Sequence, residues 1–299
     1  MADRIKTSYY IELAAVKLVE GLVRLFPLSV SRRFGALLGW KAYRVFRIRR
    51  RTALDNIVRA LPDTGQETAD AIACESYMNL GRSMVEFVSL DRLDAEKLRE
   101  MVQFESLEPV DEALASGRGV VLFTGHYGNW ELGAAALGAR GYRVNLVVGR
   151  QSNPLVNAEA NRLRAGMAAG IVDRGSGAGL RGAMRALDNN EIVAFVADQD
   201  ARHHGAFVDF LGRPASTHKG PAQFAVRRNA PVVAGFIRRL QDGTHSVALR
   251  APMWPDRSLD EDDAVGELMQ RYTDALSDAI RAHPAQYFWA HRRWKTAPP

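Results

Sequence analysis

The segment Val120-Val-Leu-Phe-Thr-Gly-His-Tyr-Gly-Asn-Trp-Glu131 joins an apolar run to a glycine-rich turn and then to the start of a helical pattern. Four consecutive apolar residues that include two valines are typical of a buried strand. A strand that passes through a short turn into a helix is the repeating unit of an α/β fold. The segment therefore predicts that His126 lies at the carboxyl end of a strand, where open α/β sheets place their ligand sites.

Further apolar runs of the same kind follow along the chain. They cover residues 144–148, 192–196 and 232–237. Helical patterns alternate with them, so the sequence predicts a central, mostly parallel sheet with crossover helices. A strand at 246–250 is expected to pair with a strand at 232–239, because the Asp-Gly pair between them is a hairpin turn signal. The last helix is expected at 262–282.

The first part of the chain is rich in apolar residues but interrupted by charges. Lys17, Glu20 and Arg24 fall within a narrow sector of a helix over residues 9–26, which leaves a broad apolar face opposite them. A second helical pattern after Pro27 mixes aromatic and aliphatic residues with arginines, as interfacial helices do. Two interpretations are open: contact with a membrane surface, and a helical hairpin that covers the core of the main domain.

These patterns divide the chain into two parts. Residues 1–62 form an N-terminal amphipathic, basic helical region, for which we expect membrane association. Residues 63–299 form the catalytic domain, and its first helix, expected at 64–90, packs on the rest of that domain. Neither an uninterrupted apolar centre nor a small-residue cleavage site is present, which argues against a cleavable signal peptide.

The net charge of +6 and the isoelectric point of about 9.6 predict an anionic partner. The basic excess is concentrated between Arg24 and Arg59. An anionic membrane surface is preferred over nucleic acid, because the sequence holds no nucleic-acid recognition motif and its apolar helical face suits a bilayer. The single cysteine, Cys74, cannot form an internal disulfide, so the cytosolic side is the expected compartment.

His126 and Glu131 are the residues with the clearest chemical pattern. Glu131 is expected in the first turn of a helix, where the positive end of the helix dipole favours an ionised carboxylate. A carboxylate five residues from an imidazole is available to orient it and to stabilise its protonated form, which is the arrangement of a general base. The alternative is a structural histidine beside a glycine-rich turn.

The segment Gly125-His-Tyr-Gly-Asn-Trp-Glu131 resembles the His-x4-Glu motif of the bacterial lipid A acyltransferases, the family of late lauroyl and myristoyl transferases. Related glycerophosphate acyltransferases usually have Asp at the second position, so Glu131 favours the lipid A branch. The resemblance extends over most of the chain after about residue 40. It includes the segments Gly149-Arg150 with Asn153-Pro154-Leu155, Arg162-Leu163-Arg164, Asp173-Arg174, Ala197-Asp198-Gln199-Asp200 and Tyr287 to Thr296.

The resemblance implies the αβα acyltransferase fold and direct acyl transfer. The donor would be a fatty-acyl thioester of acyl-carrier protein or coenzyme A, and the acceptor a hydroxyl of a lipid A precursor or related glycolipid. His126 would remove the hydroxyl proton and Glu131 would hold the imidazolium. The sequence agrees, because it has no Gly-x-Ser-x-Gly elbow and Cys74 lies in a predicted helix, so no activated nucleophile is visible. Oxyanion donors are expected either among the backbone N–H groups of 125–129 or from an arginine.

Several further residues are candidates for binding substrate. Arg162 or Arg164, with Asp198, matches polar positions of the family, while Arg150 and Arg174 are candidates for contacting phosphate. The alternative for each arginine is a surface ion pair. Residues 174–179 precede a helical pattern, so their amides are either an anion site or a flexible loop.

Neither a metal nor another cofactor is expected. The segment Asp198-Gln-Asp200 offers fewer oxygen ligands than a hard cation needs. His203, His204 and His218 lack a zinc spacing. Near the C-terminus, residues 287–295 mix aromatics with cations, which indicates either a final strand with outward-facing cations or contact with a headgroup or carrier.

The sequence thus predicts an acyltransferase attached in a peripheral or monotopic manner to the cytoplasmic face of the bacterial inner membrane. Two alternatives remain open at this stage. One keeps the chemistry but replaces the acceptor with another glycolipid, a phospholipid or an aminolipid. The other is a non-catalytic membrane-binding protein that has kept the fold, and the intact His126 and Glu131 argue against it.

Overall fold

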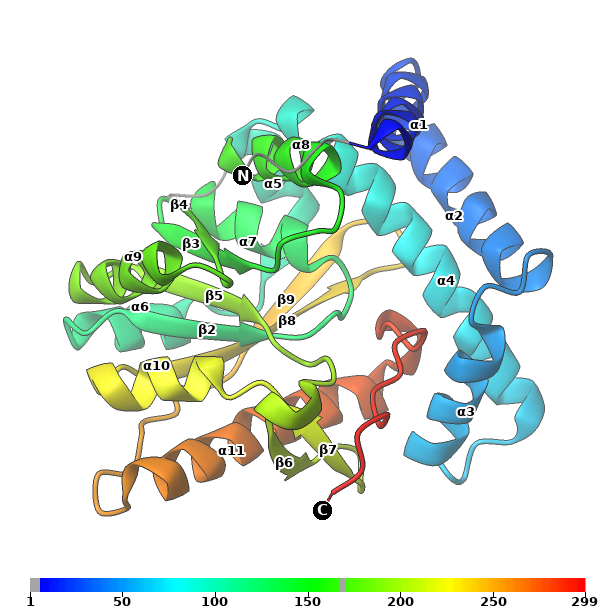
Figure 1. Cartoon of the computed structure of the whole chain (residues 1–299). Helices are drawn as coiled ribbons and strands as arrows, with labels where there is room; N and C mark the ends of the chain where they lie inside the picture. The colour runs from blue at the N-terminus through cyan, green and yellow to red at the C-terminus, as the bar shows by residue number, and fades with distance from the viewer. Residues whose placement is uncertain (1–5, 167–169, 299) are drawn as a thin grey trace.

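The computed structural model describes residues 6–166 and 170–298, and it is built around one seven-stranded sheet (Figure 1). Residues 1–5 of the N-terminal region, and 167–169 and 299 of the catalytic domain, lie outside the described residues. The strand order is β1-β9-β8-β2-β5-β3-β4, and only the β8–β9 pair is antiparallel. The strands are β1 (Val102–Phe104), β2 (Val120–Thr124), β3 (Val144–Val148), β4 (Gly170–Asp173), β5 (Ile192–Val196), β8 (Val232–Arg239) and β9 (His245–Leu249). The expected α/β class with a mostly parallel sheet is confirmed.

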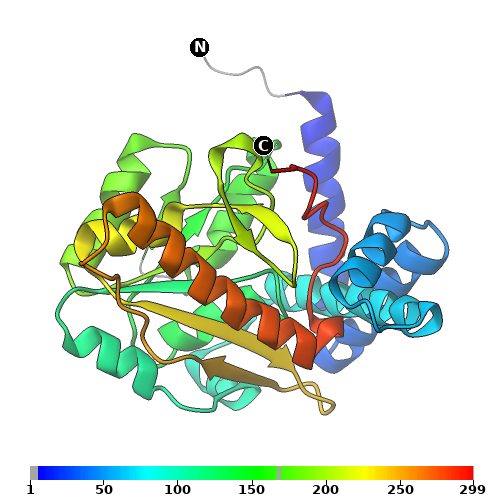
Figure 2. The same ribbon diagram turned by 90° about the horizontal axis from the view of Figure 1, so that it is seen from below.

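The central strands β2 and β5 are apolar on both faces because helices cover both sides of the sheet. On one face, Leu122 packs with residues of α6 (Glu108–Ala115) and α7 (Trp130–Gly138). On the other face, Phe123 packs with residues of α9 (Gly177–Asp188), α10 (Gly220–Arg228) and α11 (Glu261–Ala282), and its ring stacks on Tyr272 at 4.1 Å between centroids. Figure 2 shows α11 lying along its face of the sheet. The two helical layers fix the direction in which β2 delivers His126.

The hairpin expected near the end of the chain is confirmed. Strands β8 and β9 pair antiparallel, with Ile237 opposite Val247. Shorter strands were not predicted: β1 and β4 at the two edges of the sheet, and β6 (Ala206–Asp209) with β7 (Pro214–Thr217) as a separate two-stranded sheet. Each of these has only three or four residues, which is too short for a periodic pattern.

Helix α4 (Gln66–Val88) runs across the end of the sheet at which β2 and β5 finish, and the first three helices lie outside it (Figure 1). These are α1 (Thr7–Arg24), α2 (Leu28–Arg44) and α3 (Arg50–Ala60). Helix α2 packs closely along α4, because a Cβ at Gly39 would overlap the Tyr77 carbonyl oxygen and one at Gly35 would lie 2.5 Å from the Gly81 oxygen. The expected helices at 9–26, 64–90 and 262–282 are confirmed to within two or three residues. The division at residue 62 stays a prediction.

The C-terminal segment differs from the expected final strand. After α11 and the 3-10 turn η3 (Pro284–Gln286), the described chain shows one isolated bridge, between Tyr287 and Tyr127, and no strand. The prediction of a strand was wrong because this backbone is bound by side chains. The Asn56 amide donates to the carbonyl oxygens of Trp289 (2.8 Å) and His291 (2.6 Å).

The exposed apolar side chains gather on the N-terminal helices and their connections. Leu25 is 75% exposed and Phe46 is 69% exposed, values at which most of each side chain meets solvent. The others there include Tyr10, Ile11, Leu18, Leu22, Phe26, Val30, Phe34, Leu37, Leu38, Trp40, Val45 and Ile48. Within the described ranges, no helix combines the length and apolarity that crossing a bilayer requires.

Candidate active site

A cavity of about 1020 Å³ lies at the carboxyl ends of the central strands, beside α4. It is lined by His126 from the β2–α7 turn, by Glu131 and Trp130 from the start of α7, and by Gln199 and Asp200 from the loop after β5. Because β2 and β5 are neighbours in the sheet, both loops emerge at the same edge. The predicted position of His126 at the carboxyl end of a strand is confirmed.

The imidazole of His126 is bonded to Asp198, not to Glu131. Its Nδ1 lies 2.6 Å from Oδ1 of Asp198, whose side chain is only 2% exposed. Burial raises the pKa of Asp198, but the charge of His126 and its hydrogen bonds outweigh this effect and lower that pKa to about 2. The carboxylate is therefore ionised throughout the physiological pH range and can only accept.

This contact sets the tautomer of the neutral imidazole. Nδ1 must carry the proton that Asp198 accepts, so Nε2 is left with its lone pair. The Gln199 side-chain nitrogen lies 3.3 Å from Nε2 and the Trp130 ring packs edge-on at 4.7 Å between centroids. With Nδ1 protonated, Nε2 is the acceptor in the contact with Gln199, so a hydroxyl group must take the place of the Gln199 amide to donate to it. His126 lines the cavity with 22% of its side chain exposed, and a polarised imidazole in this position is able to take a proton from such a hydroxyl group.

Glu131 has a different partner from the one that the sequence predicted. Its position in the first turn of α7 is confirmed, but its carboxylate accepts from Arg164 of α8 (Pro154–Ala165), whose Nε lies 3.0 Å from Oε2. The Arg164 guanidinium also lies over the Phe87 ring, at 5.3 Å to the centroid. The Glu131–Arg164 pair forms one wall of the cavity that holds His126.

The turn that carries His126 is fixed by bonds from three directions. Asn129 caps α7 by accepting from the Leu132 N–H (3.1 Å), and its amide donates to the buried carboxylate of Glu86 (2.7 Å). Gly128 has φ +60°, and a Cβ there would overlap the Ile237 carbonyl oxygen, so a glycine is required at this position. The backbone N–H of Phe288 donates to the His126 carbonyl oxygen (3.0 Å). The His126 imidazole is therefore held on a rigid turn.

Glu86 is the centre of a buried ion-pair network that sequence reasoning missed. It also accepts from Arg239 of β8 (2.6 Å) and from Arg32 of α2 (2.6 Å). Burial raises the pKa of Glu86, but the bonds from Arg239 and the positive charges around it lower that pKa to about 2. The network thus joins α2 to the Asn129 cap of the catalytic turn. A single glutamate on an amphipathic helix gives no signal of this role.

The other arginines predicted to bind substrate do not all lie in the cavity. Arg174 lines the cavity. Arg150 pairs with Asp173 at 3.0 Å and is not among the lining residues. Arg162 pairs with Asp91 (3.2 Å) and Glu20 of α1 (3.3 Å), so it joins α8 to the N-terminal helices. In the segment 174–179, Ser176 caps α9 by accepting from the Gly179 N–H.

An apolar slot adjoins the cavity and runs between α7 and the sheet. It shares Trp130, Glu131 and Val148 with the cavity, so it opens beside His126. Its walls are almost entirely apolar, with Phe104, Leu122, Ala134, Leu137, Leu146, Ala194, Ile237, Val247 and Leu249 among the lining residues. Its free volume is about 70 Å³, so in this conformation the slot holds only a short part of a hydrocarbon chain whose end lies beside the imidazole.

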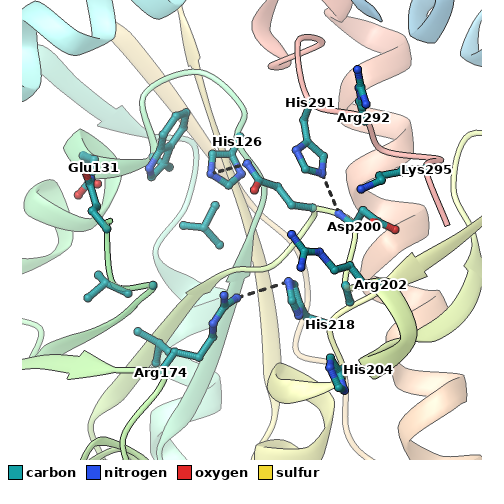
Figure 3. A pocket seen from close by; sticks show the side chains of 18 of the residues that line it. His126, Glu131, Arg174, Asp200, Arg202, His204, His218, His291, Arg292 and Lys295 are labelled. Atoms are coloured by element: carbon teal, nitrogen blue, oxygen red, sulfur yellow. Dashed lines mark hydrogen bonds between the residues drawn. The ribbon is translucent and has the colours of Figure 1, made fainter. Parts of the chain in front are cut away.

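The cavity also contains cations that were not among the predicted substrate-binding residues, namely Arg49, Arg202, Arg292 and Lys295. The last three are labelled in Figure 3. The run of cations near the C-terminus was noted, but only the fold brings it beside His126. No group of three or more His, Cys, Asp or Glu side chains suited to a metal ion occurs within residues 6–166 and 170–298.

Comparison with known proteins identifies the family. The family model described as bacterial lipid A biosynthesis acyltransferase matches residues 3–296. The chain belongs to this family. It is an acyltransferase. The lipid A biosynthesis lauroyltransferase of Escherichia coli K12 is 25% identical over 281 residues, which cover 93% of this chain and 89% of that protein.

Two other known proteins are similar to this acyltransferase, one in sequence and one in structure. The phosphatidylinositol mannoside acyltransferase of Mycobacterium tuberculosis CDC 1551 is 26% identical over 246 residues, which cover 80% of this chain and 75% of that protein. The crystal structure of the 1-acyl-sn-glycerophosphate acyltransferase PlsC from Thermotoga maritima shares 13% identity, with a TM-score of 0.40 and coverage of 88% of this chain and 100% of that one. That structural likeness is too low to support an inference.

Proposed function

We propose that this acyltransferase moves a fatty-acyl chain from an acyl thioester, carried by acyl-carrier protein or coenzyme A, to a hydroxyl of a lipid A precursor or related glycolipid. His126 is the general base. The observation that carries the proposal is the buried Asp198 carboxylate on Nδ1 of His126, in a cavity that opens into an apolar slot. Glu131 was expected to hold the imidazolium, but in this proposal Asp198 is the carboxylate partner of the imidazole.

The reaction proceeds by direct attack. The acceptor hydroxyl donates to Nε2 of His126, and its proton passes to that nitrogen as the oxygen bonds to the thioester carbonyl carbon. The C–S bond then breaks, and the imidazolium returns the proton to the departing thiolate. Asp198 stabilises the imidazolium between these two steps, since it is ionised and 2.6 Å from Nδ1.

The oxyanion of the tetrahedral intermediate needs donors close to the imidazole. Sequence reasoning left backbone amides and an arginine open for this role. Arg164 is engaged by Glu131, whereas the first turn of α7 begins at Trp130, whose ring is in contact with His126. We assign oxyanion stabilisation to the Trp130 and Glu131 amides of that first turn, because the Leu132 N–H already donates to Asn129, and the helix dipole adds to their effect.

The apolar slot is the proposed binding site of the acyl chain. It begins at Trp130 and Glu131 and continues over α7 and the inner strands. A chain lying there places its thioester carbonyl at the junction of slot and cavity, beside His126. The depth of the slot then limits acyl length, because a longer chain would meet the packed side chains at its far end.

The acceptor is assigned from the relatives. The E. coli relative is named for lipid A and the M. tuberculosis relative for a phosphatidylinositol mannoside, and both names describe glycolipids. We place lipid A precursors first because the family model covers residues 3–296. A phosphoinositol mannoside-like lipid is the second candidate, favoured by a similar identity over 80% of the chain.

The N-terminal helices are the proposed membrane-contacting region, on the cytoplasmic face of the inner membrane. The exposed apolar side chains of α1, α2 and the turns after them are accompanied by exposed cations such as Arg33, Lys41 and Arg47. This combination suits the headgroup and acyl boundary of an anionic bilayer. Flotation with anionic vesicles tests it: we expect Leu25→Ser/Phe46→Ser to float less than wild type, and equal flotation would contradict the assignment.

The activity itself is tested with purified enzyme in detergent. Acyl-carrier protein and coenzyme A thioesters are offered with a panel of glycolipids, phospholipids and aminolipids, and products are identified by mass spectrometry. We expect transfer to a lipid A precursor and a loss of at least about 10³-fold with His126→Ala. Equal transfer by His126→Ala, or preference for a non-glycolipid acceptor, would refute the corresponding part of the proposal.

A further inference from the structure

Four exposed cations, Arg174, Arg202, Arg292 and Lys295, line the cavity. We call these four residues the cation cluster. In the view of Figure 3, Arg202, Arg292 and Lys295 lie on the other side of His126 from Glu131, and Arg174 lies below His126. The four cations come from three separate segments: the loop after β4, the 3-10 turn η2 (Arg202–His204), and the C-terminal segment. Within the part of the chain that the structure describes, none of the four forms an ion pair, and only Arg174 has a side-chain hydrogen bond, to His218 at 3.4 Å.

Three other arginines near the cavity are paired with acids: Arg164 with Glu131, Arg162 with Glu159 and Asp91, and Arg150 with Asp173. Arg49 also lines the cavity and, among the described residues, forms no ion pair. The cluster therefore differs from the three paired arginines in having no acidic partner. Four positive charges in one cavity repel each other, and a bound anionic ligand would reduce this repulsion.

The backbone that carries the cluster is held in place. Arg293, between two cluster members, is 2% exposed and donates to the Ser216 carbonyl oxygen at 2.6 Å. The Ser216 hydroxyl in turn donates to the carbonyl oxygen of Arg202 at 2.6 Å. Arg202 has φ +56°, a conformation that costs free energy for a residue with a side chain. Buried contacts therefore fix the backbone from which Arg202 and the C-terminal cations extend.

Asp200 adds a different kind of group to the same cavity. Its Oδ2 accepts from the Thr296 hydroxyl at 3.1 Å, and its backbone N–H donates to His291 at 3.0 Å. Its Oδ1 is buried and has no hydrogen-bond partner among the described residues. A buried carboxylate oxygen without a donor is costly, and a hydroxyl of a bound ligand would satisfy it.

The neighbouring His218 is consistent with a site of high positive potential. Burial lowers its pKa, and the charges of Arg174 and Arg293 lower it further, to about 4. The imidazole is therefore neutral in the absence of ligand, and it leaves the positive charge of the cavity to the cluster.

We infer that the cation cluster and Asp200 form a subsite for a phosphate group with a hydroxyl beside it. The inference rests on the proposed acyl transfer, because this subsite and the apolar slot meet at His126. Two substrates of the reaction carry that chemistry: a phosphorylated sugar of the acceptor, and the phosphopantetheine of the thioester donor. Guanidinium and ammonium groups bind either phosphate through charge-assisted hydrogen bonds.

The test uses Arg202→Ala/Lys295→Ala, with Arg202→Lys/Lys295→Arg as the charge-conserving variant. Arg118→Ala is the matched control, since Arg118 is an exposed arginine that precedes the opposite end of β2. Steady-state kinetics are measured for one glycolipid acceptor with its phosphate and after phosphatase treatment, each at saturating acyl-CoA and at saturating acyl-carrier protein thioester. The two donors are then varied in turn at a saturating concentration of each acceptor.

We expect the alanine variant to raise the KM of the phosphorylated acceptor at least about tenfold, with kcat nearly unchanged and little effect on the dephosphorylated acceptor. The charge-conserving variant should restore most of this loss. A rise in the KM of both donors, with either acceptor, would also support the subsite and assign the phosphate to phosphopantetheine. Equal KM values for all substrates in wild type and alanine variant would overturn the inference.

A binding measurement separates this inference from the proposed function. Pyrophosphate should raise the melting temperature of wild type and of Arg118→Ala, but not that of the alanine variant, because a ligand stabilises only the form that binds it. An enzyme that transfers no acyl group yet shows this difference would refute the function and keep the subsite. Equal stabilisation of wild type and alanine variant would refute the subsite alone.

Discussion

Asp198 and Glu131 are both carboxylates at the site, yet Asp198 bonds to a titratable imidazole and Glu131 to a permanent cation. Asp198 has a side-chain exposure of 2% and reaches His126 from the loop after β5, the strand next to β2. Glu131 has a side-chain exposure of 12% and points to Arg164 on another helix. Glu131 is only five residues from His126 in the sequence, yet it is not the carboxylate that bonds to the imidazole. The order of the strands in the sheet decides the partner, because it places β5 and the loop after it beside β2.

The substitution Asp198→Asn is expected to have the largest effect on the rate of acyl transfer. The amide keeps the size of the side chain but removes the charge and allows the wrong imidazole tautomer. We expect kcat to fall by roughly 10³-fold. The measurement is acyl transfer to the preferred acceptor, with Glu131→Gln assayed in parallel. A loss smaller for Asp198→Asn than for Glu131→Gln would reverse the roles assigned to the two carboxylates.

The stability of the folded protein in acid provides a second comparison, between wild type and Asp198→Asn. Since the pKa of Asp198 is lowered from 3.8 to about 2, its ionised form contributes stability that is present above 3.8 and lost as the pH falls toward 2. Between about pH 6 and about pH 2, wild type should lose roughly 2 kcal/mol more unfolding free energy than Asp198→Asn. Urea unfolding at several pH values measures this. Parallel curves for the two proteins would show that the carboxylate is not stabilised in the folded state.

The substitution Glu131→Gln tests the role of the second carboxylate. Loss of its charge leaves Arg164 unpaired in a partly buried wall of the cavity, so we expect the wall to shift and kcat/KM to fall about tenfold. Glu159→Gln is the matched control, because Glu159 pairs with Arg162 on the same helix but outside the cavity lining. A tenfold loss with Glu159→Gln as well would mean that α8 stability, and not the cavity wall, is measured.

The smallest effect is expected in the apolar slot. Ala134→Leu fills part of the slot, so the preferred acyl chain should shorten by about two carbons, with a few-fold change in rate on the original chain. Competition among thioesters of different chain length measures the preference. Ala178→Leu, the same change on an exposed position of α9, should leave it unchanged. An unaltered preference in Ala134→Leu would place the acyl chain elsewhere.

The sequence predicted features that depend on local patterns. The buried strands β2 and β5 have apolar runs of four and five residues, and Glu131 follows a turn that begins a helix, so both could be placed correctly. The pairing of His126 with Asp198 depends on β5 lying beside β2, which is a tertiary fact. Asp198 was singled out by resemblance, but its position directly after an apolar strand was the physical signal that could have placed it at the same sheet edge.

Features with no sequence period were missed. Glu86 and Arg239 form the buried network behind the catalytic turn, although each reads as one more charged residue of a helix or strand. The cations at 292 and 295 were visible as a charged run, but their approach to Arg202 is produced by the path of the C-terminal segment. Expected strand pairing failed there because buried side chains bind the backbone.

The nitrogen protonation of His126 tests the central claim most directly. Protein labelled with 15N-histidine is examined by NMR at about pH 8, and the signals of His126, one of seven histidines, are assigned by their absence in His126→Asn. If Asp198 accepts from Nδ1, the spectrum shows a protonated Nδ1 and an unprotonated Nε2, and Asp198→Asn loses this preference. A protonated Nε2 in the wild-type enzyme would contradict His126 as the general base of this acyl transfer.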